Sequence, residues 1–274
     1  MAPRRLTLSD GTAVPTLGQG TWYLGDDPSR RDAEIATLRA GIDLGMTLVD
    51  TAEMYGGGRS EDLVGEAIRA RRDEVFLVDK VLPSNASRRG TVEACERSLR
   101  RLGTDRIELY LLHWPGPYPL EDTVAAFHEL ADRGLIGGWG VSNFDPEDLA
   151  ELPERPLVDQ VLYNPSRRGP EFDLFPAMRG SGVVAMAYSP VEQGRLLGHP
   201  ALAEVARRHG ATPARVLLAW AIREGGVVAI PKAAHVAHVE DNAAAWELSL
   251  DPEDLALIDA AFPPPTRPQP LEML

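Results

Sequence analysis

The chain has 274 residues, of which 44% are hydrophobic and 25% are charged, as is usual for a globular protein. Its 28 basic and 41 acidic residues give a formal net charge of −13. Nonspecific binding to nucleic acid needs a basic surface, so this balance argues against a nucleic-acid partner.

Two other classes of protein are disfavoured by the sequence. No apolar run approaches the roughly 18 residues of a membrane-spanning helix, and no apolar segment of a signal peptide follows the N-terminal arginines. The single cysteine, Cys95, cannot form an internal disulfide, which is typical of a reducing compartment. We therefore expect a cytoplasmic protein without a membrane partner.

Short apolar runs alternate along the chain with longer segments of helical periodicity. The turn Ser9-Asp10-Gly11 joins residues 5–8 to residues 13–14 and predicts a small β-hairpin. After the hairpin we expect eight buried strands, at residues 16–20, 48–50, 74–78, 107–112, 136–141, 157–163, 183–187 and 227–230. The expected helices are residues 30–44, 60–71, 89–102, 120–133, 171–179, 201–209, 213–223, 239–248 and 252–261, with a short helix from Pro146.

The strands are short and continuously apolar, as in a parallel sheet that is covered on both faces. Eight strands separated by helices, in a chain of this length, predict an α/β fold of the (β/α)8 barrel type. No internal repeat, linker or charge block divides residues 1–274, so we expect one domain. The proline-rich segment 263–265 is expected to lie over the barrel surface.

The strand at residues 48–50 ends on Asp50, and a short loop carries Tyr55 a few residues further. Three glycines, 56–58, predict a sharp turn there, and Ser60 is expected to cap the next helix. A carboxylate and a phenol thus reach the C-terminal ends of the strands, where barrels of this type have their active sites. Glu53 lies between them and faces no partner that the sequence identifies.

Only two of the 28 basic residues are lysines, Lys80 and Lys232, and both lie at strand ends. An ammonium is compact and its pKa shifts more readily than that of a guanidinium, so a retained lysine suggests a specific role. Lys80 beside Tyr55 would favour the phenolate and ease proton donation, while Asp50 would hold Lys80 charged. His113 can donate a hydrogen bond to an oxygen that gains negative charge.

These residue types suit a reaction in which a carbonyl oxygen becomes an alkoxide and is protonated. Nothing in the set supplies electrons, so the chemistry implies a cofactor that carries hydride.

Four residues and five short strings occur in a fixed order along the chain. The residues are Asp50, Tyr55, Lys80 and His113, and the strings are Gly18-Gln19-Gly20-Thr21-Trp22, Val49-Asp50-Thr51-Ala52, Leu112-His113-Trp114-Pro115, Gly140-Val141-Ser142-Asn143-Phe144 and Ile230-Pro231-Lys232. In this order the chain resembles the aldo-keto reductases over essentially its whole length, and the four residues match the catalytic tetrad of that family. Within the family it is most similar to the bacterial 2,5-diketo-D-gluconate reductase-like branch.

The resemblance implies reduction of an aldehyde or ketone to an alcohol by hydride transfer from NADPH, with Tyr55 as the proton donor. NADPH would lie extended across the barrel mouth, with Tyr188 under the nicotinamide ring and Lys232 at the adenosine 2′-phosphate. The cofactor-binding residues that the resemblance implies are Gly20, Thr21, Trp22, Asp50, Ser142, Asn143, Gln160, Tyr188, Ser189, Val191, Gln193, Gly194, Ile230, Lys232, Ala233, His238, Asp241 and Asn242.

The chain departs from the family pattern at two of these positions. Ala233 stands where the family often has serine or threonine, and His238 stands where it often has arginine. Both family residues usually help to hold the 2′-phosphate, so we expect a weaker preference for NADPH, and NADH stays open as a cofactor. If a protonated His238 contributes, NADPH should bind less tightly as the pH rises.

The small-molecule carbonyl substrate is expected in an open, shallow site walled by Trp22, Tyr23, Met54 and Trp114, with Leu82 as a further candidate. The identity of the substrate is not readable, because loops form such sites. No exposed apolar stripe indicates a partner, so we expect a monomer.

Two other functions stay open. A nicotinamide-binding regulatory subunit would bind the cofactor without turnover. A metal-dependent hydrolase on the same barrel could use His235 and His238 as ligands, but these lie at a helix start, far from His113 in the barrel order, and we expect no metal. The glycine motifs of a Rossmann dehydrogenase and of a serine hydrolase are absent from the sequence.

Overall fold

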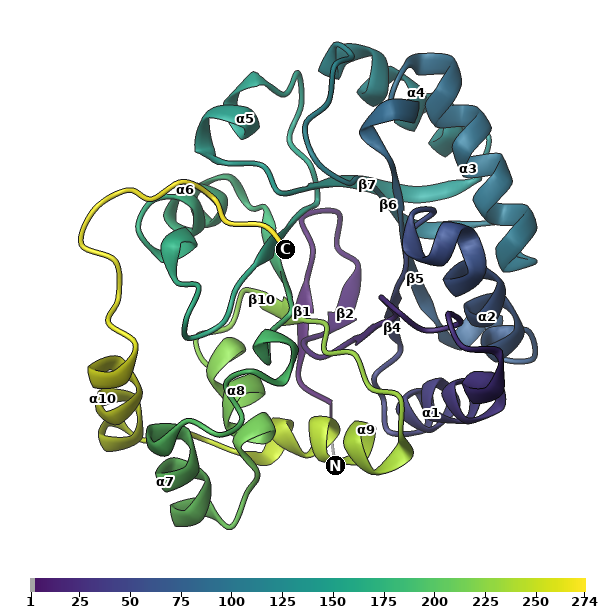
Figure 1. Cartoon of the computed structure of the whole chain (residues 1–274). Helices are drawn as coiled ribbons and strands as arrows, with labels where there is room; N and C mark the ends of the chain where they lie inside the picture. The colour runs from purple at the N-terminus through teal and green to yellow at the C-terminus, as the bar shows by residue number, and fades with distance from the viewer. Residues whose placement is uncertain (1–2) are drawn as a thin grey trace.

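A computed structural model of the protein describes residues 3–274. Eight parallel strands form one sheet in the order β10-β9-β8-β7-β6-β5-β4-β3. Backbone hydrogen bonds from Gly18 N to Ala229 O (2.9 Å) and from Gly20 N to Pro231 O (3.1 Å) join its two edges. The sheet is therefore a barrel (Figure 1), as predicted. Its strands are β3 Gln19–Gly20, β4 Leu48–Asp50, β5 Phe76–Val81, β6 Ile107–Leu112, β7 Ile136–Ser142, β8 Val158–Leu162, β9 Val184–Tyr188 and β10 Val227–Ala229.

The predicted hairpin precedes the barrel and consists of β1 (Arg5–Thr7) and β2 (Ala13–Pro15), which pair antiparallel. Leu8 and Val14 are buried and pack in one cluster with side chains from the first residues of several strands, among them Leu48. The hairpin thus closes the end of the barrel at which the strands begin. The opposite end stays open for a site.

Helices surround the sheet (Figure 1) and cover the outward-facing apolar residues of its strands. They are α1 Arg31–Asp43, α2 Arg59–Ile68, α3 Arg88–Leu102, α4 Leu120–Asp132, α5 Pro146–Glu151, α6 Leu174–Ser181, α7 Pro200–His209, α8 Pro213–Ala221, α9 Val236–Ala243 and α10 Pro252–Ala261. Helix α1 packs against both α2 and α9, so the ring of helices closes as the sheet does. Within residues 3–274 no helix is long and apolar enough to span a bilayer.

The start of α2 differs from the prediction. The helix begins at Arg59, after Gly58, and no side chain caps it, so the expectation that Ser60 would be the cap was wrong. The Ser60 hydroxyl instead lies 2.8 Å from Thr21 Oγ1, in a fully buried contact with the loop after β3. The three glycines form the predicted turn, with φ values of 59°, 65° and 99° for Gly56, Gly57 and Gly58.

Element boundaries differ most where strand pairing decides them. The strand expected at residues 16–20 is reduced to β3, whereas β5 continues to Val81 because Val81 pairs with Leu112 of β6. Lys80 consequently lies within the sheet ladder and not on a loop after it. The helix expected at residues 171–179 begins at Leu174, after a separate 3₁₀ turn. The helix expected at residues 239–248 ends at Ala243, and a second 3₁₀ turn follows it.

The C-terminal segment after α10 crosses the outside of the barrel past α6 and ends over the barrel mouth (Figure 1). Its start is held by Arg168, whose Nη1 donates to Phe262 O at 2.7 Å. Nearer its end, Glu272 forms an ion pair with Arg167. The segment covers the barrel surface as expected, and its last residues also reach the site.

Candidate active site

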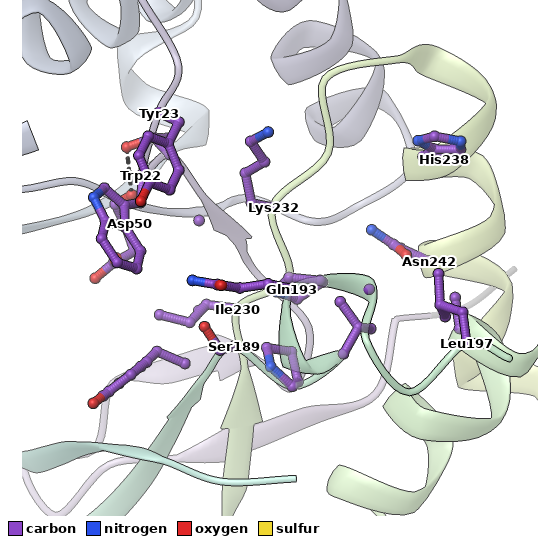
Figure 2. Close-up of a pocket in the computed structure, with 18 of the residues that line it drawn as sticks. Trp22, Tyr23, Asp50, Ser189, Gln193, Leu197, Ile230, Lys232, His238 and Asn242 are labelled. Atoms are coloured by element: carbon purple, nitrogen blue, oxygen red, sulfur yellow. Dashed lines mark hydrogen bonds between the residues drawn. The ribbon is translucent and has the colours of Figure 1, made fainter. Parts of the chain in front are cut away.

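A cavity of about 480 Å³ runs across the C-terminal ends of β3, β4, β9 and β10. Figure 2 shows Trp22 and Asp50 at one end of this cavity and His238 and Asn242 at the other, with Lys232 between them. A long groove of this kind fits an elongated ligand better than a compact one.

A second cavity of about 340 Å³ adjoins the first and shares Trp22, Tyr55 and Tyr188 with it. The two cavities therefore meet at the phenol of Tyr55. The other residues that line the second cavity are Met54, His113, Trp114, Ser142, Asn143, Gln160, Met273 and Leu274.

Two other residues of the predicted tetrad, Asp50 and Tyr55, contact the ammonium of Lys80. Lys80 Nζ lies 2.8 Å from Asp50 Oδ2, 2.9 Å from the carbonyl oxygen of Thr51 and 3.1 Å from the hydroxyl of Tyr55. Lys80 is fully buried. Each of the three ammonium hydrogens thus has its own acceptor, which is what a buried charge requires.

The ion pair in this cluster is stabilised from both sides. Burial lowers the pKa of Lys80, but electrostatic attraction and hydrogen bonds to Asp50 and Tyr55 outweigh it, so the pKa lies above its ordinary value. Burial also raises the pKa of Asp50, and Lys80 and Gln160 oppose that shift. The contact of 2.8 Å between the two groups holds Lys80 protonated.

Lys80 favours the phenolate of Tyr55, as expected, but burial acts in the opposite direction and is the larger effect. Burial raises the pKa of Tyr55 above the ordinary value, and the Lys80 ammonium offsets only part of this shift. The net direction was not apparent from the sequence, which does not show how deeply the phenol is buried. The phenol is protonated at neutral pH, and Lys80 favours its ionised form by less than burial disfavours it.

His113 follows β6 and lies beside Tyr55, with the two ring centroids 5.8 Å apart and the rings nearly perpendicular. Burial, followed by repulsion from Lys80, lowers the pKa of His113 to about 2. The imidazole is therefore neutral across the physiological range. Its Nδ1 is buried and has no hydrogen-bond partner among residues 3–274.

A chain of hydrogen bonds connects the tetrad to the far wall of the second cavity. Gln160 Nε2 donates to Asp50 Oδ1 at 2.7 Å, and Ser142 Oγ donates to the carbonyl oxygen of Gln160 at 2.8 Å. Asn143 Nδ2 donates to Ser142 Oγ at 3.0 Å, and the hydroxyl of Tyr188 donates to Asn143 Oδ1 at 2.9 Å. The structure thus brings together four residues that the resemblance assigned to one part of the cofactor.

Backbone strain gathers in the loops at this end of the barrel. Among residues 3–274, the non-glycine residues with positive φ are Tyr23, Asn143, Ser189, Glu192 and Gln193, and all five lie in loops that follow barrel strands. Each such residue costs on the order of 1–3 kcal/mol and persists only where its surroundings hold it. Four of the five line a cavity.

Glu192 explains how one of these strained loops is held. It is 3% exposed, and its carboxylate accepts hydrogen bonds from Asn164 (2.7 Å), Arg167 (3.1 Å) and Arg195 (2.7 Å). Burial raises its pKa, but Arg195, Arg167 and Asn164 together lower it below the ordinary value. No local sequence pattern indicated this role for Glu192, because its partners come from two separate loops.

The far end of the long cavity contains most of the residues expected there. His238, Asp241 and Asn242 line this end, and Lys232 lies between the two ends, whereas Ala233 does not line the cavity. Burial, then repulsion from a nearby arginine, lowers the pKa of Lys232. The carboxylate of Asp241 is held by Arg215 at 2.6 Å and 3.1 Å, so its charge is compensated at this end of the groove.

Comparison with known proteins identifies the family. The model of the aldo/keto reductase family matches residues 16–262. The chain belongs to the aldo/keto reductase family. A methylglyoxal reductase, YeaE, from Escherichia coli (strain K12) is 48% identical over the full length of both chains. A glyoxal reductase from Bacillus subtilis (strain 168) is 34% identical over 92% of this chain and 91% of its own length.

Solved structures agree with this assignment. An aldo/keto reductase from Klebsiella pneumoniae, crystallised in complex with NADP and acetate, is 46% identical and superimposes with a TM-score of 0.97 over the whole of both chains. A second crystal structure from that organism, with NADPH, has the same identity, TM-score and coverage. The expected fold and family are therefore confirmed.

The structure adds residues that sequence reasoning missed. Pro231, Leu197 and Ala214 line the long cavity, and Met273 and Leu274 line the second one. The expected walls of the second cavity, Trp22, Met54 and Trp114, are present, while Tyr23 lines the long cavity and stacks on Trp22 at 4.6 Å. Leu82 lines neither cavity. No local pattern indicated that the chain end returns to the barrel mouth. Because it does, the second cavity is more enclosed than the open site that we expected.

The low pKa of His113 is directly testable. Its imidazole should stay neutral, so its ring-proton NMR signals, assigned by comparison with the variant His113→Gln, should not shift between pH 8 and pH 5. The unfolded chain binds this proton below about pH 6.5 and the folded protein does not, so the site lowers stability as the pH falls through that range. A titration with a midpoint near 6.5 in the folded protein would contradict this assignment.

Proposed function

We propose that this protein reduces the carbonyl group of a small aldehyde or ketone to an alcohol with NADPH. The observation that carries the proposal is the position of Lys80 Nζ, 2.8 Å from Asp50 Oδ2 and 3.1 Å from the hydroxyl of Tyr55, where the two cavities meet. A protonated phenol beside a buried ammonium is a suitable general acid for a carbonyl oxygen. The family and the NADP-bound structures support the same reaction.

The residues of the long cavity fit the cofactor in charge and shape. Lys232 provides a cation between the two ends of this cavity, and the ion pair of Asp241 with Arg215 compensates a carboxylate charge that would otherwise repel a phosphate. In the adjoining second cavity, Ser142, Asn143 and Gln160 would bind a carboxamide. Tyr188 lines both cavities, and its ring would lie under the nicotinamide. When bound, NADPH supplies the hydride.

The tetrad residues have separate tasks in this proposal. Tyr55 donates its proton to the oxygen that gains charge, and Lys80 stabilises the phenolate that remains, because the ammonium lies 3.1 Å from that oxygen. Asp50 keeps Lys80 charged and oriented. Neutral His113 donates a hydrogen bond to the carbonyl oxygen, which orients the substrate without transferring a net charge.

The substrate class that we favour is a small, uncharged 2-oxoaldehyde. The second cavity is small, about 340 Å³, and it is walled by Trp22, Trp114 and the chain end. The relatives named methylglyoxal reductase and glyoxal reductase support this class. Trp22, Tyr23, Met54 and Trp114 remain the proposed substrate contacts.

We also propose that residues 1–274 act as one cytoplasmic domain, as a monomer and without a nucleic-acid or membrane partner. The net charge of −13 and the single cysteine support this proposal.

The proposed activity is tested by the loss of NADPH absorbance at 340 nm with a panel of aldehydes and ketones that includes methylglyoxal and glyoxal. We expect turnover, fastest with these small compounds, and the same panel with NADH measures the cofactor preference. Titrations of NADPH near pH 6 and pH 8 test whether His238 contributes, since its protonated form would bind tighter. Binding of NADPH without turnover would favour a regulatory subunit, and activity that is lost to a chelator and needs no nicotinamide would favour a metal hydrolase.

The proton donor is tested by the variant Tyr55→Phe. Removal of one hydroxyl should lower kcat by at least about a hundredfold, the size typical of a lost general acid, while the Kd for NADPH stays within twofold. Steady-state kinetics and fluorescence titration measure the two quantities. Turnover within tenfold of the wild-type rate would show that another group donates the proton.

The wall formed by the chain end is tested by a truncation that removes Met273 and Leu274. The second cavity should widen, so kcat/KM for bulky aromatic aldehydes should rise relative to that for methylglyoxal, with NADPH affinity little changed. The ratio of the two kcat/KM values is the measurement. An unchanged ratio would mean that these two residues do not limit the substrate.

A further inference from the structure

Glu53 is a buried residue that lies between Asp50 and Tyr55 in the sequence. The reaction proposed above does not use its carboxylate. Glu53 is 8% exposed. Its Oε1 accepts hydrogen bonds from the backbone N–H of Leu82 at 2.8 Å and from Asn85 Nδ2 at 2.9 Å. Its Oε2 lies 3.5 Å from Arg97 Nη2. The sequence had identified no partner for Glu53, and the structure provides three.

Leu82 and Asn85 lie on the loop that follows β5, and Arg97 lies in α3. Glu53 itself lies on the loop that carries Tyr55. The backbone N–H of Glu53 donates to the carbonyl oxygen of Lys80 at 3.3 Å, and that of Thr51 donates to Val78 at 2.9 Å. The backbone thus follows β5 as far as Glu53, and the Glu53 side chain continues the attachment beyond the strand end. The carboxylate holds together the two loops whose side chains meet at the tetrad.

The loop held by Glu53 also contacts the loop that follows His113. A Cβ built on Gly116 would lie 2.5 Å from Pro83 Cβ, so the two loops approach as closely as a glycine permits. Pro83 lies between Leu82 and Asn85, the two residues that donate to Glu53. The position of this turn therefore affects three of the four tetrad residues.

We propose that Glu53 is a positioning residue that keeps the hydroxyl of Tyr55 within hydrogen-bond distance of Lys80. It touches neither the substrate cavity nor the reacting atoms and acts only through the two loops. Without its carboxylate, the half-buried N–H of Leu82 and the amide of Asn85 lose their acceptor, and the loops must shift to find another. The effect on turnover rests on the proposed function, but the effect on the loops does not.

The acceptor matters more than the charge in this arrangement. The contact with Arg97 is long, and the side chain of Arg97 is 39% exposed, so water and salt screen it. The two contacts of Oε1 are short and directed. A glutamine keeps one acceptor oxygen of the same reach, so Glu53→Gln should preserve the positioning that Glu53→Ala removes.

The chain offers a matched control in Glu108. Its carboxylate also accepts a backbone N–H from β5, that of Leu77 at 2.9 Å, and pairs with Arg72 at 2.7 Å. These contacts lie at the opposite end of the strand. The variant Glu108→Ala therefore removes a similar set of bonds without reaching the tetrad loops.

The test compares Glu53→Ala, Glu53→Gln, Glu108→Ala and the wild type in kcat, KM and NADPH affinity. We expect Glu53→Ala to lose about tenfold to a hundredfold in kcat, as for a misplaced catalytic group, with the Kd for NADPH within twofold. Glu53→Gln should keep kcat within about threefold, and Glu108→Ala should keep it within twofold. A kcat for Glu53→Ala within twofold of the wild type, or equal losses in the Ala and Gln variants, would overturn the proposal.

Amide hydrogen exchange gives a readout that does not depend on turnover. Exchange in Glu53→Ala should be faster in residues 51–58 and 81–86 and unchanged elsewhere, whereas Glu108→Ala should leave these two segments unchanged. Exchange that is unchanged in both segments would overturn the proposal. If the wild type itself shows no turnover, the proposed function fails, while the exchange pattern still decides the role of Glu53.

If Glu53→Ala does not fold, Glu53→Asp takes its place. The shorter side chain keeps the charge but cannot reach both Leu82 and Asn85, so kcat should fall in the same way. A kcat within twofold of the wild type in that variant would again overturn the proposal.

Discussion

The buried ammonium of Lys80 is the charge around which this end of the barrel is arranged. An unpaired ammonium without contact to water would cost several kcal/mol, so the surrounding chain must supply both an opposite charge and three acceptors. Asp50 provides the charge, and Thr51 and Tyr55 complete the set. These acceptors come from β4 and its loop, which explains why the stretch between Asp50 and Tyr55 must keep one conformation. The contacts that stabilise the buried charge of Lys80 also place the phenol of Tyr55 beside it.

The remaining architecture keeps those few atoms in place. The hairpin closes one end of the barrel, and the loops at the other end contain every non-glycine residue with positive φ that the structure describes. Two buried carboxylates, Glu53 and Glu192, hold loops at this end by accepting hydrogen bonds from neighbouring segments. Strain and buried charge are thus concentrated at the C-terminal end of the barrel. The strained backbone lowers local stability there, and it persists because the surrounding contacts hold the site in one arrangement.

Much of this site was predictable, because its residues lie in short motifs at strand ends. Asp50, Lys80 and Tyr55 were predicted to meet, and they do, since parallel strands bring their C-terminal ends to one edge. Residues that act over a distance in sequence were not predictable. Serine is a residue type that often caps helices, but the hydroxyl of Ser60 donates a hydrogen bond to Thr21 on another loop. The chain end, at Leu274, lies at the barrel mouth although it follows the last strand and helix of the barrel. No local pattern in the sequence predicts that position.

The sequence by itself determined the order of strands and helices, the barrel and the meeting of Asp50, Tyr55 and Lys80 at one end of it, because hydrophobic periodicity and motif spacing are local properties of the chain. Only the tertiary structure decided the electrostatics. Lys80 was expected to favour the phenolate of Tyr55, yet burial raises the pKa of Tyr55 by more than Lys80 lowers it. Burial likewise lowers the pKa of His113 to about 2. The free energy of transferring a charge out of water depends on all the atoms packed around it, and these come from segments that the sequence does not place side by side.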